Sequence, residues 1–309
     1  MNDRRKQLMA EAVLVLVMLF WGTTFVVVKE VIRTVPVHWF LTLRFSTAAV
    51  VLWGLLAVTP REQKGAAPGL RWRAAGAGAL LGVVLSVSYA FQTSGLLTTT
   101  ASKSAFILST AVLWVPFLMV VALRVPIERK TLLAGGTGLA GLLLLVMDNG
   151  WARFWSDGVV VGDVLTLFCA VAVAVHLILT KRYSHRYDTT VLTAVQVSVV
   201  ALLNLLCSVI RQETRSFAYP FTTYAAIGFL GLVATSFNFW AFTRAQRYTT
   251  AQRTAVMLLL EPLFAAAIAW FVLREHFILH QWCGAALILG AMFVLEARTR
   301  RQDTSEAAK

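Results

Sequence analysis

The chain is dominated by long apolar runs, each long enough to cross a lipid bilayer as a helix. A transmembrane helix needs about 20 consecutive, mostly apolar residues. Ten segments meet or nearly meet this requirement: 12–32, 37–58, 74–97, 104–123, 131–147, 162–180, 191–209, 224–243, 254–273 and 281–297. Their apolar residues are continuous and do not alternate at every second position, which favours helices over the strands of a barrel. We therefore expect an all-α integral membrane protein with ten transmembrane helices.

Composition argues against a soluble fold, because 58% of the residues are hydrophobic and only 14% are charged. Soluble domains carry roughly 25% charged residues. The formal net charge of +13 is compatible with nucleic-acid binding in principle. However, the basic residues sit in short clusters between apolar runs, and they form no basic stripe. We expect the lipid bilayer, and not nucleic acid, as the partner of this surface.

The clusters of basic residues predict how the chain is oriented in the membrane. With ten spans, 20 of the 28 Lys and Arg residues, Arg253 among them, fall on the side of the N-terminus. The opposite side holds six: Arg33, Lys103, Arg153, Arg211, Arg215 and Arg274. Lys29 and Arg44 lie within spans, and Lys29 is expected to extend toward the membrane interface, as is Lys181. By the positive-inside rule, both termini are expected in the cytoplasm of a bacterial inner-membrane protein, with a short cytoplasmic tail.

The chain also contains an internal repeat. Shifting it by 150 residues aligns TTASKSA at 99–105 with TTAQRTA at 249–255, and a shift of 152 aligns Lys29 with Lys181 and Arg44 with Gln196. These matches predict two five-helix repeats, 1–150 and 151–309. Five is an odd number of crossings, so the second repeat enters the membrane from the opposite side. Inverted repeats give a protein two related conformations around a site near the membrane midplane, as alternating access requires.

Three motifs resemble those of a known family. They are Trp21-Gly22-Thr23-Thr24-Phe25 with Lys29 following, Leu43-Arg44-Phe45, and the stretch Leu260-Glu261-Pro262-Leu263-Phe264-Ala265 followed by Leu273-Arg274-Glu275. Together they are similar to the signature positions of EamA-type permeases of the drug/metabolite transporter superfamily. The resemblance covers essentially the whole chain. It implies ten spans arranged as five plus five, and export of amino acids or other metabolites.

Two ionisable residues inside the spans are candidates for function, because a charged group at mid-helix costs roughly 2.5–3.5 kcal/mol on insertion scales. Glu261 is a coupling candidate that would bind a proton or an amine; alternatively, it is a structural partner of Arg44 or of hydroxyl groups. Pro262 beside it is expected to bend the helix. Arg44 would hold a substrate carboxylate, or it forms a structural ion pair.

Aromatic and amide side chains inside the spans suggest a substrate cavity. The candidates for its wall are Trp21, Arg44, Tyr89, Gln92, Trp114, His176, Gln196, Asn238 and Trp240. Aromatic walls with a few polar groups suit an amino acid or a flat organic solute. Each aromatic residue has an alternative role as an interfacial anchor, and His176 has one as a hydrogen-bonded interior residue.

The sequence contains no catalytic constellation such as GxSxG, HExxH, a P-loop or GxGxxG in a suitable context. The three cysteines, Cys169, Cys207 and Cys283, lie in apolar runs without metal-binding spacing. We therefore expect no enzyme activity, cofactor or metal. The sequence favours a secondary transporter that exports amino acids or related small molecules through a central cavity between the repeats. The alternatives are an importer or exchanger of a nucleotide-sugar-like or drug-like solute and, less favoured, an intramembrane enzyme; homodimer formation stays open.

Overall fold

The computed structural model describes residues 3–58, 68–124, 129–147, 158–273 and 278–291, and the regular structure within these ranges is helical. The helices are α1 (Asp3–Gly22), α2 (Thr24–Val31), α3 (Val37–Val58), α4 (Pro68–Gly95), α5 (Ala101–Ser109), α6 (Ala111–Leu123), α7 (Arg129–Val146), α9 (Val161–Ser184), α10 (Thr189–Ile210), α11 (Phe221–Gly231), the π-helix η1 (Leu232–Phe237), α12 (Asn238–Ala245), α13 (Ala251–Met257), α14 (Leu260–Leu273), and a last helix at 279–291. The predicted all-α membrane fold is confirmed.

Nine helical segments within the described ranges are long and apolar enough to cross a membrane. They correspond to the first nine predicted spans. The helix at 279–291 begins the tenth, whose predicted remainder at 292–297 lies outside the described residues. The predicted span 37–58 coincides with α3. By contrast, α1 begins at Asp3 instead of residue 12, because the helix continues through the charged residues that precede its apolar part. Arg153, Arg274 and Glu275 also lie outside the described residues.

Four of the spans are not continuous α-helices. The first is interrupted at Thr23 and the fourth at Thr110. The ninth is interrupted at Leu258 and Leu259. Pro262 accounts for this last break, because a proline ring clashes with the carbonyl four residues earlier, here that of Leu258. In the eighth span, a π-helical turn, η1, separates α11 from α12. Apart from the bend at Pro262, these interruptions were not predicted.

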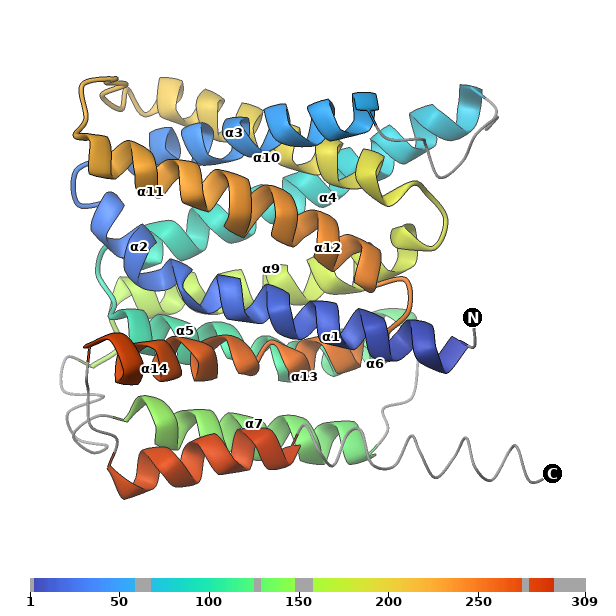
Figure 1. Cartoon of the computed structure of the whole chain (residues 1–309), viewed down its shortest axis with the longest axis vertical. Coiled ribbons are helices and arrows are strands. Elements are labelled where there is room, and N and C mark those ends of the chain that lie inside the picture. The colour runs from blue at the N-terminus through green and yellow to red at the C-terminus, as the bar shows by residue number, and fades with distance from the viewer. Residues whose placement is uncertain (1–2, 59–67, 125–128, 148–157, 274–277, 292–309) are drawn as a thin grey trace.

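The helices lie side by side along a common direction, as Figure 1 shows. At one edge of the bundle, α10 packs against α3 and α4, and α4 packs against α9. Near the opposite edge, α7 and the helix at 279–291 approach so closely that a Cβ on Gly141 would lie 2.7 Å from the carbonyl oxygen of Gly284. Between these edges α1, α5, α9, α12 and α14 surround the centre of the bundle (Figure 1).

The two copies of the repeated motif form the same local structure. Thr100 caps α5 by accepting a hydrogen bond from Lys103 N at 3.1 Å, and Thr250 caps α13 by accepting one from Arg253 N at 3.2 Å. The connections that hold these caps, α4–α5 and α12–α13, lie at opposite ends of the bundle (Figure 1). This placement is what an inverted repeat requires, and it supports that prediction.

Lys29 and Lys181, which the repeat aligns, also make equivalent contacts. Lys29 Nζ donates to Thr99 O at 2.8 Å, just beyond the end of α4. Lys181 Nζ donates to Gln246 O at 3.0 Å and to Arg247 O at 3.1 Å, just beyond the end of α12. Both ammonium groups therefore satisfy carbonyl groups after a helix terminus, where no intrahelical donor is available. The extension of both side chains toward the membrane interface stays a prediction.

Candidate functional site

A cavity of about 90 Å³ lies at the centre of the bundle. Its wall is formed by side chains of α1–α5 from the first predicted repeat and of α9, α12 and α14 from the second. A single buried water needs roughly 10–15 Å³ on a comparable measure, so this space is large enough for a small solute. Of the predicted residues, seven line it: Trp21, Arg44, Tyr89, Gln92, His176, Glu261 and Pro262.

Aromatic rings form one wall of the cavity. The ring of Trp21 lies 5.3 Å from those of Phe239 and Phe242, and the ring of Tyr89 lies 6.1 Å from that of Phe239. The Trp21 indole is fixed because its Nε1 donates to Ala234 O at 2.9 Å, a carbonyl within η1. Buried indole N–H groups usually require such an acceptor. The tryptophan therefore presents its ring, not its donor, to the cavity.

Arg44 reaches the cavity from α3 with only 2% of its surface exposed. Its Nε donates to Thr235 Oγ1 at 2.8 Å, and Thr235 in turn donates to Leu230 O, five residues earlier. Its guanidinium carbon lies 5.0 Å from the centre of the Tyr89 ring, within cation–π range. The π-helical turn and Tyr89 therefore hold the guanidinium in place from two sides.

Glu261 reaches the cavity from the first turn of α14 and is 9% exposed. Its backbone lies against α1, since a Cβ on Gly22 would be 2.6 Å from Glu261 O. Within the described part of the chain, the Glu261 carboxylate forms no hydrogen bond and no ion pair, so the alternative of a salt bridge to Arg44 is not found. A buried carboxylate without such a partner is energetically costly unless a proton or a cation joins it.

The other four predicted residues do not line the cavity. Gln196 lies behind it, with its Oε1 3.1 Å from His176 Nε2. Asn238 donates to Val17 O at 3.1 Å, and Trp240 donates to Thr190 Oγ1 at 3.2 Å. Trp114 is half-buried on α6, with its ring 5.9 Å from that of Phe117. Gln196 and Asn238 are buried where helices meet, and neither Trp114 nor Trp240 faces the central space.

Sequence reasoning missed Cys169, Phe239 and Phe242, all of which line the cavity. The two phenylalanines are three positions apart on α12, so they share one face of the helix. The predicted residue was their neighbour Asn238, which lies on another face of the helix and bonds to α1. Cys169 was interpreted only as an apolar residue, and it is indeed buried, although beside the cavity.

Known proteins and a family model resemble this chain over almost its whole length. The model of the EamA-like transporter family matches residues 8–147 and again residues 160–296. An uncharacterized transporter of Archaeoglobus fulgidus is 28% identical over 293 residues, which are 95% of this chain and 87% of that protein. The uncharacterized transporter YetK of Bacillus subtilis is 24% identical over 99% of this chain and 92% of its own length. One solved crystal structure has the same fold, with a TM-score of 0.74 at 18% identity over 95% of this chain and 98% of that chain.

Proposed function

Because the chain belongs to the EamA-like transporter family, we propose that it is a secondary transporter that exports amino acids or related small metabolites. It is a multi-pass membrane transporter and not an enzyme. The proposal adds a substrate class, a direction and a mechanism of alternating access between inverted halves. It also places the protein in a bacterial inner membrane with both termini in the cytoplasm.

The observation that carries the substrate class is the pair of opposite charges in one small cavity. Glu261 supplies a carboxylate that forms no hydrogen bond or ion pair within the described residues, and Arg44 supplies a guanidinium. An amino acid carries an ammonium and a carboxylate, so it complements both groups at once. Carboxylate binding by arginine is favoured by the geometry of the guanidinium. The ring of Trp21 and its neighbours offers an apolar surface for the side chain of such a solute.

The composition of the wall supports alternating access. Helices of both predicted repeats contribute side chains, so a movement of one repeat against the other changes access to the same space. The Glu261 carboxylate also gives the transporter a group that can exchange a proton for a substrate ammonium. Such an exchange would link export to a proton gradient.

Counterflow tests this function directly. Purified protein in liposomes loaded with individual amino acids should exchange internal for external labelled amino acid with at least one member of a panel. Trp21→Phe shrinks the aromatic wall of the cavity and removes the hydrogen bond to Ala234 O that fixes it, and Trp114→Phe is the matched control because Trp114 lies outside the cavity. We expect the first substitution, and not the second, to reduce exchange. No exchange with any amino acid would refute the substrate class.

Proton coupling has its own measurement. Export driven by an imposed pH gradient should disappear in Glu261→Gln, because the amide cannot bind and release a proton. Counterflow at equal pH on both sides, which needs no net proton movement, is the internal comparison. An unchanged response to the pH gradient would remove Glu261 from the coupling step.

A further inference from the structure

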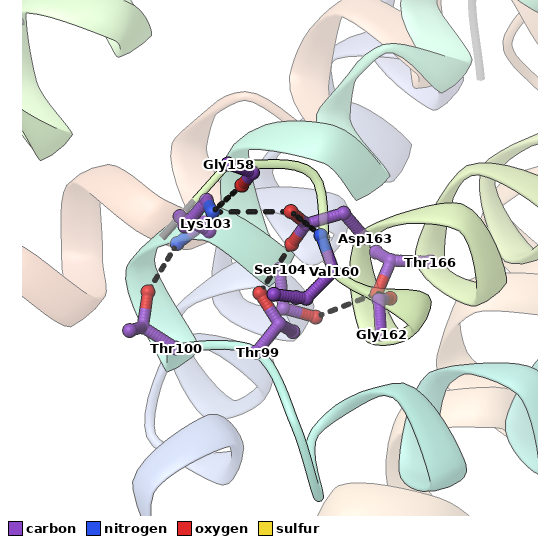
Figure 2. A network of polar contacts seen from close by, with 9 residues as sticks. All are labelled: Thr99, Thr100, Lys103, Ser104, Gly158, Val160, Gly162, Asp163 and Thr166. Carbon is purple, nitrogen blue, oxygen red and sulfur yellow. Dashed lines mark hydrogen bonds and ion pairs between the residues drawn. The ribbon is translucent and has the colours of Figure 1, made fainter. Parts of the chain in front are cut away.

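A buried polar network joins the two predicted repeats at the α4–α5 end of the bundle. Figure 2 shows Lys103, at the start of α5, facing Asp163, at the start of α9. Lys103 Nζ lies 3.0 Å from Asp163 Oδ2, and these side chains are only 5% and 4% exposed. Thr99 Oγ1 donates to Asp163 Oδ1 at 2.5 Å, and Lys103 Nζ also donates to Gly158 O at 3.2 Å. Lys103 was predicted on the side opposite the N-terminus, but its burial was not predicted: the first turn of α5 carries the side chain into the interior.

A second ion pair joins the repeats at the opposite end. Arg253, at the start of α13, lies with its Nη1 2.6 Å from Oε1 of Glu11 on α1. These two side chains are 14% and 15% exposed. Gln7 Nε2 also donates to Glu11 Oε1 at 2.9 Å. This pair is thus less buried than the first and has a simpler set of hydrogen bonds around the carboxylate.

The two ion pairs are equivalent under the internal repeat. The shift of 150 residues aligns Lys103 with Arg253, and the shift of 152 that aligns Lys29 with Lys181 also aligns Glu11 with Asp163. In each pair the base comes from the fourth span of one repeat and the acid from the first span of the other. The same contact between repeats therefore occurs once at each end of the bundle.

Both pairs lie beyond the cavity, in opposite directions along the bundle. Asp163 precedes the cavity residue Cys169 by six positions on α9, roughly 9 Å along a helix axis. Glu11 precedes the cavity residue Trp21 by ten positions on α1, roughly 15 Å. The cavity therefore lies between the two pairs along the bundle.

We propose that these two ion pairs are the closures of the transport path, so that each breaks when its own end of the bundle opens. This inference rests on the proposed alternating access. A buried ion pair suits a reversible closure because its partners attract strongly in a dry interior but weakly once water surrounds them. Entry of water at an opening end hydrates both separated charges. The pair at the other end stays intact.

The native Cys169 provides a reporter that needs no substrate. In a Cys207→Ser, Cys283→Ser background, a membrane-impermeant cationic methanethiosulfonate reagent is added to right-side-out or inverted membrane vesicles, and the rate of Cys169 modification is measured from each side. Asp163→Asn should raise the rate about tenfold from one side, and Glu11→Gln should raise it from the other side. Glu30→Gln is the control, because it breaks an exposed pair with Arg33 whose side chains are 69% and 66% exposed.

A charge exchange guards against variants that simply fold poorly. Glu11→Arg combined with Arg253→Glu restores opposite charges, and it should return the labelling rate toward that of the parent protein. The proposal is overturned if Asp163→Asn and Glu11→Gln act from the same side, if both behave like Glu30→Gln, or if the exchanged pair stays as reactive as the single variant. Failure of the amino-acid assignment would appear differently, as absent counterflow with side-specific labelling intact.

Discussion

The ion pair at the α4–α5 end of the bundle is part of a buried polar network, whereas the ion pair at the α12–α13 end is backed by a layer of apolar side chains. At the first end, Asp163 accepts hydrogen bonds from Thr99 and Val160 in addition to its ion pair. At the second, Leu14 and its neighbours on α1 pack with residues of α13 in one buried cluster that lies between the Glu11–Arg253 pair and the cavity. The cavity accordingly lies nearer the polar end.

This difference shows that two copies of one sequence motif can lie in different structural surroundings. Both copies cap a helix in the same way and place a base in its first turn. The two acids, Asp163 and Glu11, differ in burial. The layer of side chains between each acid and the cavity also differs in length along the helix. One end is held by a few strong, directional contacts and the other by many weak ones. The following predictions test that contrast, in order of decreasing effect.

Asp163→Asn should have the largest effect on stability. It leaves the Lys103 ammonium buried beside a neutral amide, and breaking a buried ion pair in this way costs about 3–5 kcal/mol. Glu11→Gln, at the less deeply buried pair, should cost less, about 1.5–3 kcal/mol. Thermal unfolding of the purified variants in detergent measures both. Equal losses would show that the polar end is no more dependent on its ion pair than the apolar end.

Leu14→Ala should weaken the apolar end. Leu14 is fully buried, and truncating such a leucine to alanine costs about 2–5 kcal/mol through lost contacts and the cavity left behind. Labelling of Cys169 from the side of α12–α13 should then become faster, with labelling from the other side unchanged. If the variant loses stability but the labelling rate of Cys169 stays unchanged, the apolar packing at this end stabilises the protein without closing the path to the cavity.

Gly162→Ala should loosen the polar end by a steric route. A Cβ at this position would lie 2.9 Å from Thr99 N and closer still to Gly95 O, so α4 and α9 would have to move apart. Overpacking of this kind typically costs about 1–3 kcal/mol. Gly228→Ala is the control, since a Cβ there meets nothing within 4 Å. Unfolding temperatures should fall for the first variant and stay level or rise for the second.

Thr100→Ala and Thr250→Ala should give the smallest effects, and these should be equal. Each removes one capping hydrogen bond to a backbone N–H in the first turn of its helix, a loss of about 1 kcal/mol. Thermal unfolding of the two variants, measured side by side, tests whether the two caps contribute equally to stability. Clearly different losses of stability would mean that the different surroundings of the two ends also change the strength of the capping hydrogen bonds.

The sequence predicted the order and approximate position of the nine spans found within the described residues, because bilayer thickness fixes how long an apolar run must be. The span 37–58 coincides with α3, for example. Breaks within spans were harder to predict. Pro262 gives a visible signal for the one at Leu258, but the π-helical turn at 232–237 contains neither proline nor any other local marker.

The cavity was predicted in part for a related reason. Hydropathy identifies which polar residues are inside a span, but not which face of the helix meets which neighbour. Asn238 and Phe239 are adjacent in sequence, yet Asn238 bonds to α1 and Phe239 lines the cavity. The interior position of Lys103 was not predicted, because it depends on the cap at Thr100 and on an acid 60 residues further along the chain.

The contact between Gly22 and the carbonyl of Glu261 makes a natural pivot for α1. Because no side chain separates the two backbones there, we expect α1 to tilt about this point when its end of the bundle opens. Glu11 lies eleven residues away from Gly22, roughly 16 Å along the axis, so a tilt of about 20° would displace it by about 5 Å. That movement is enough to part Glu11 from Arg253 while Trp21, next to the pivot, hardly moves.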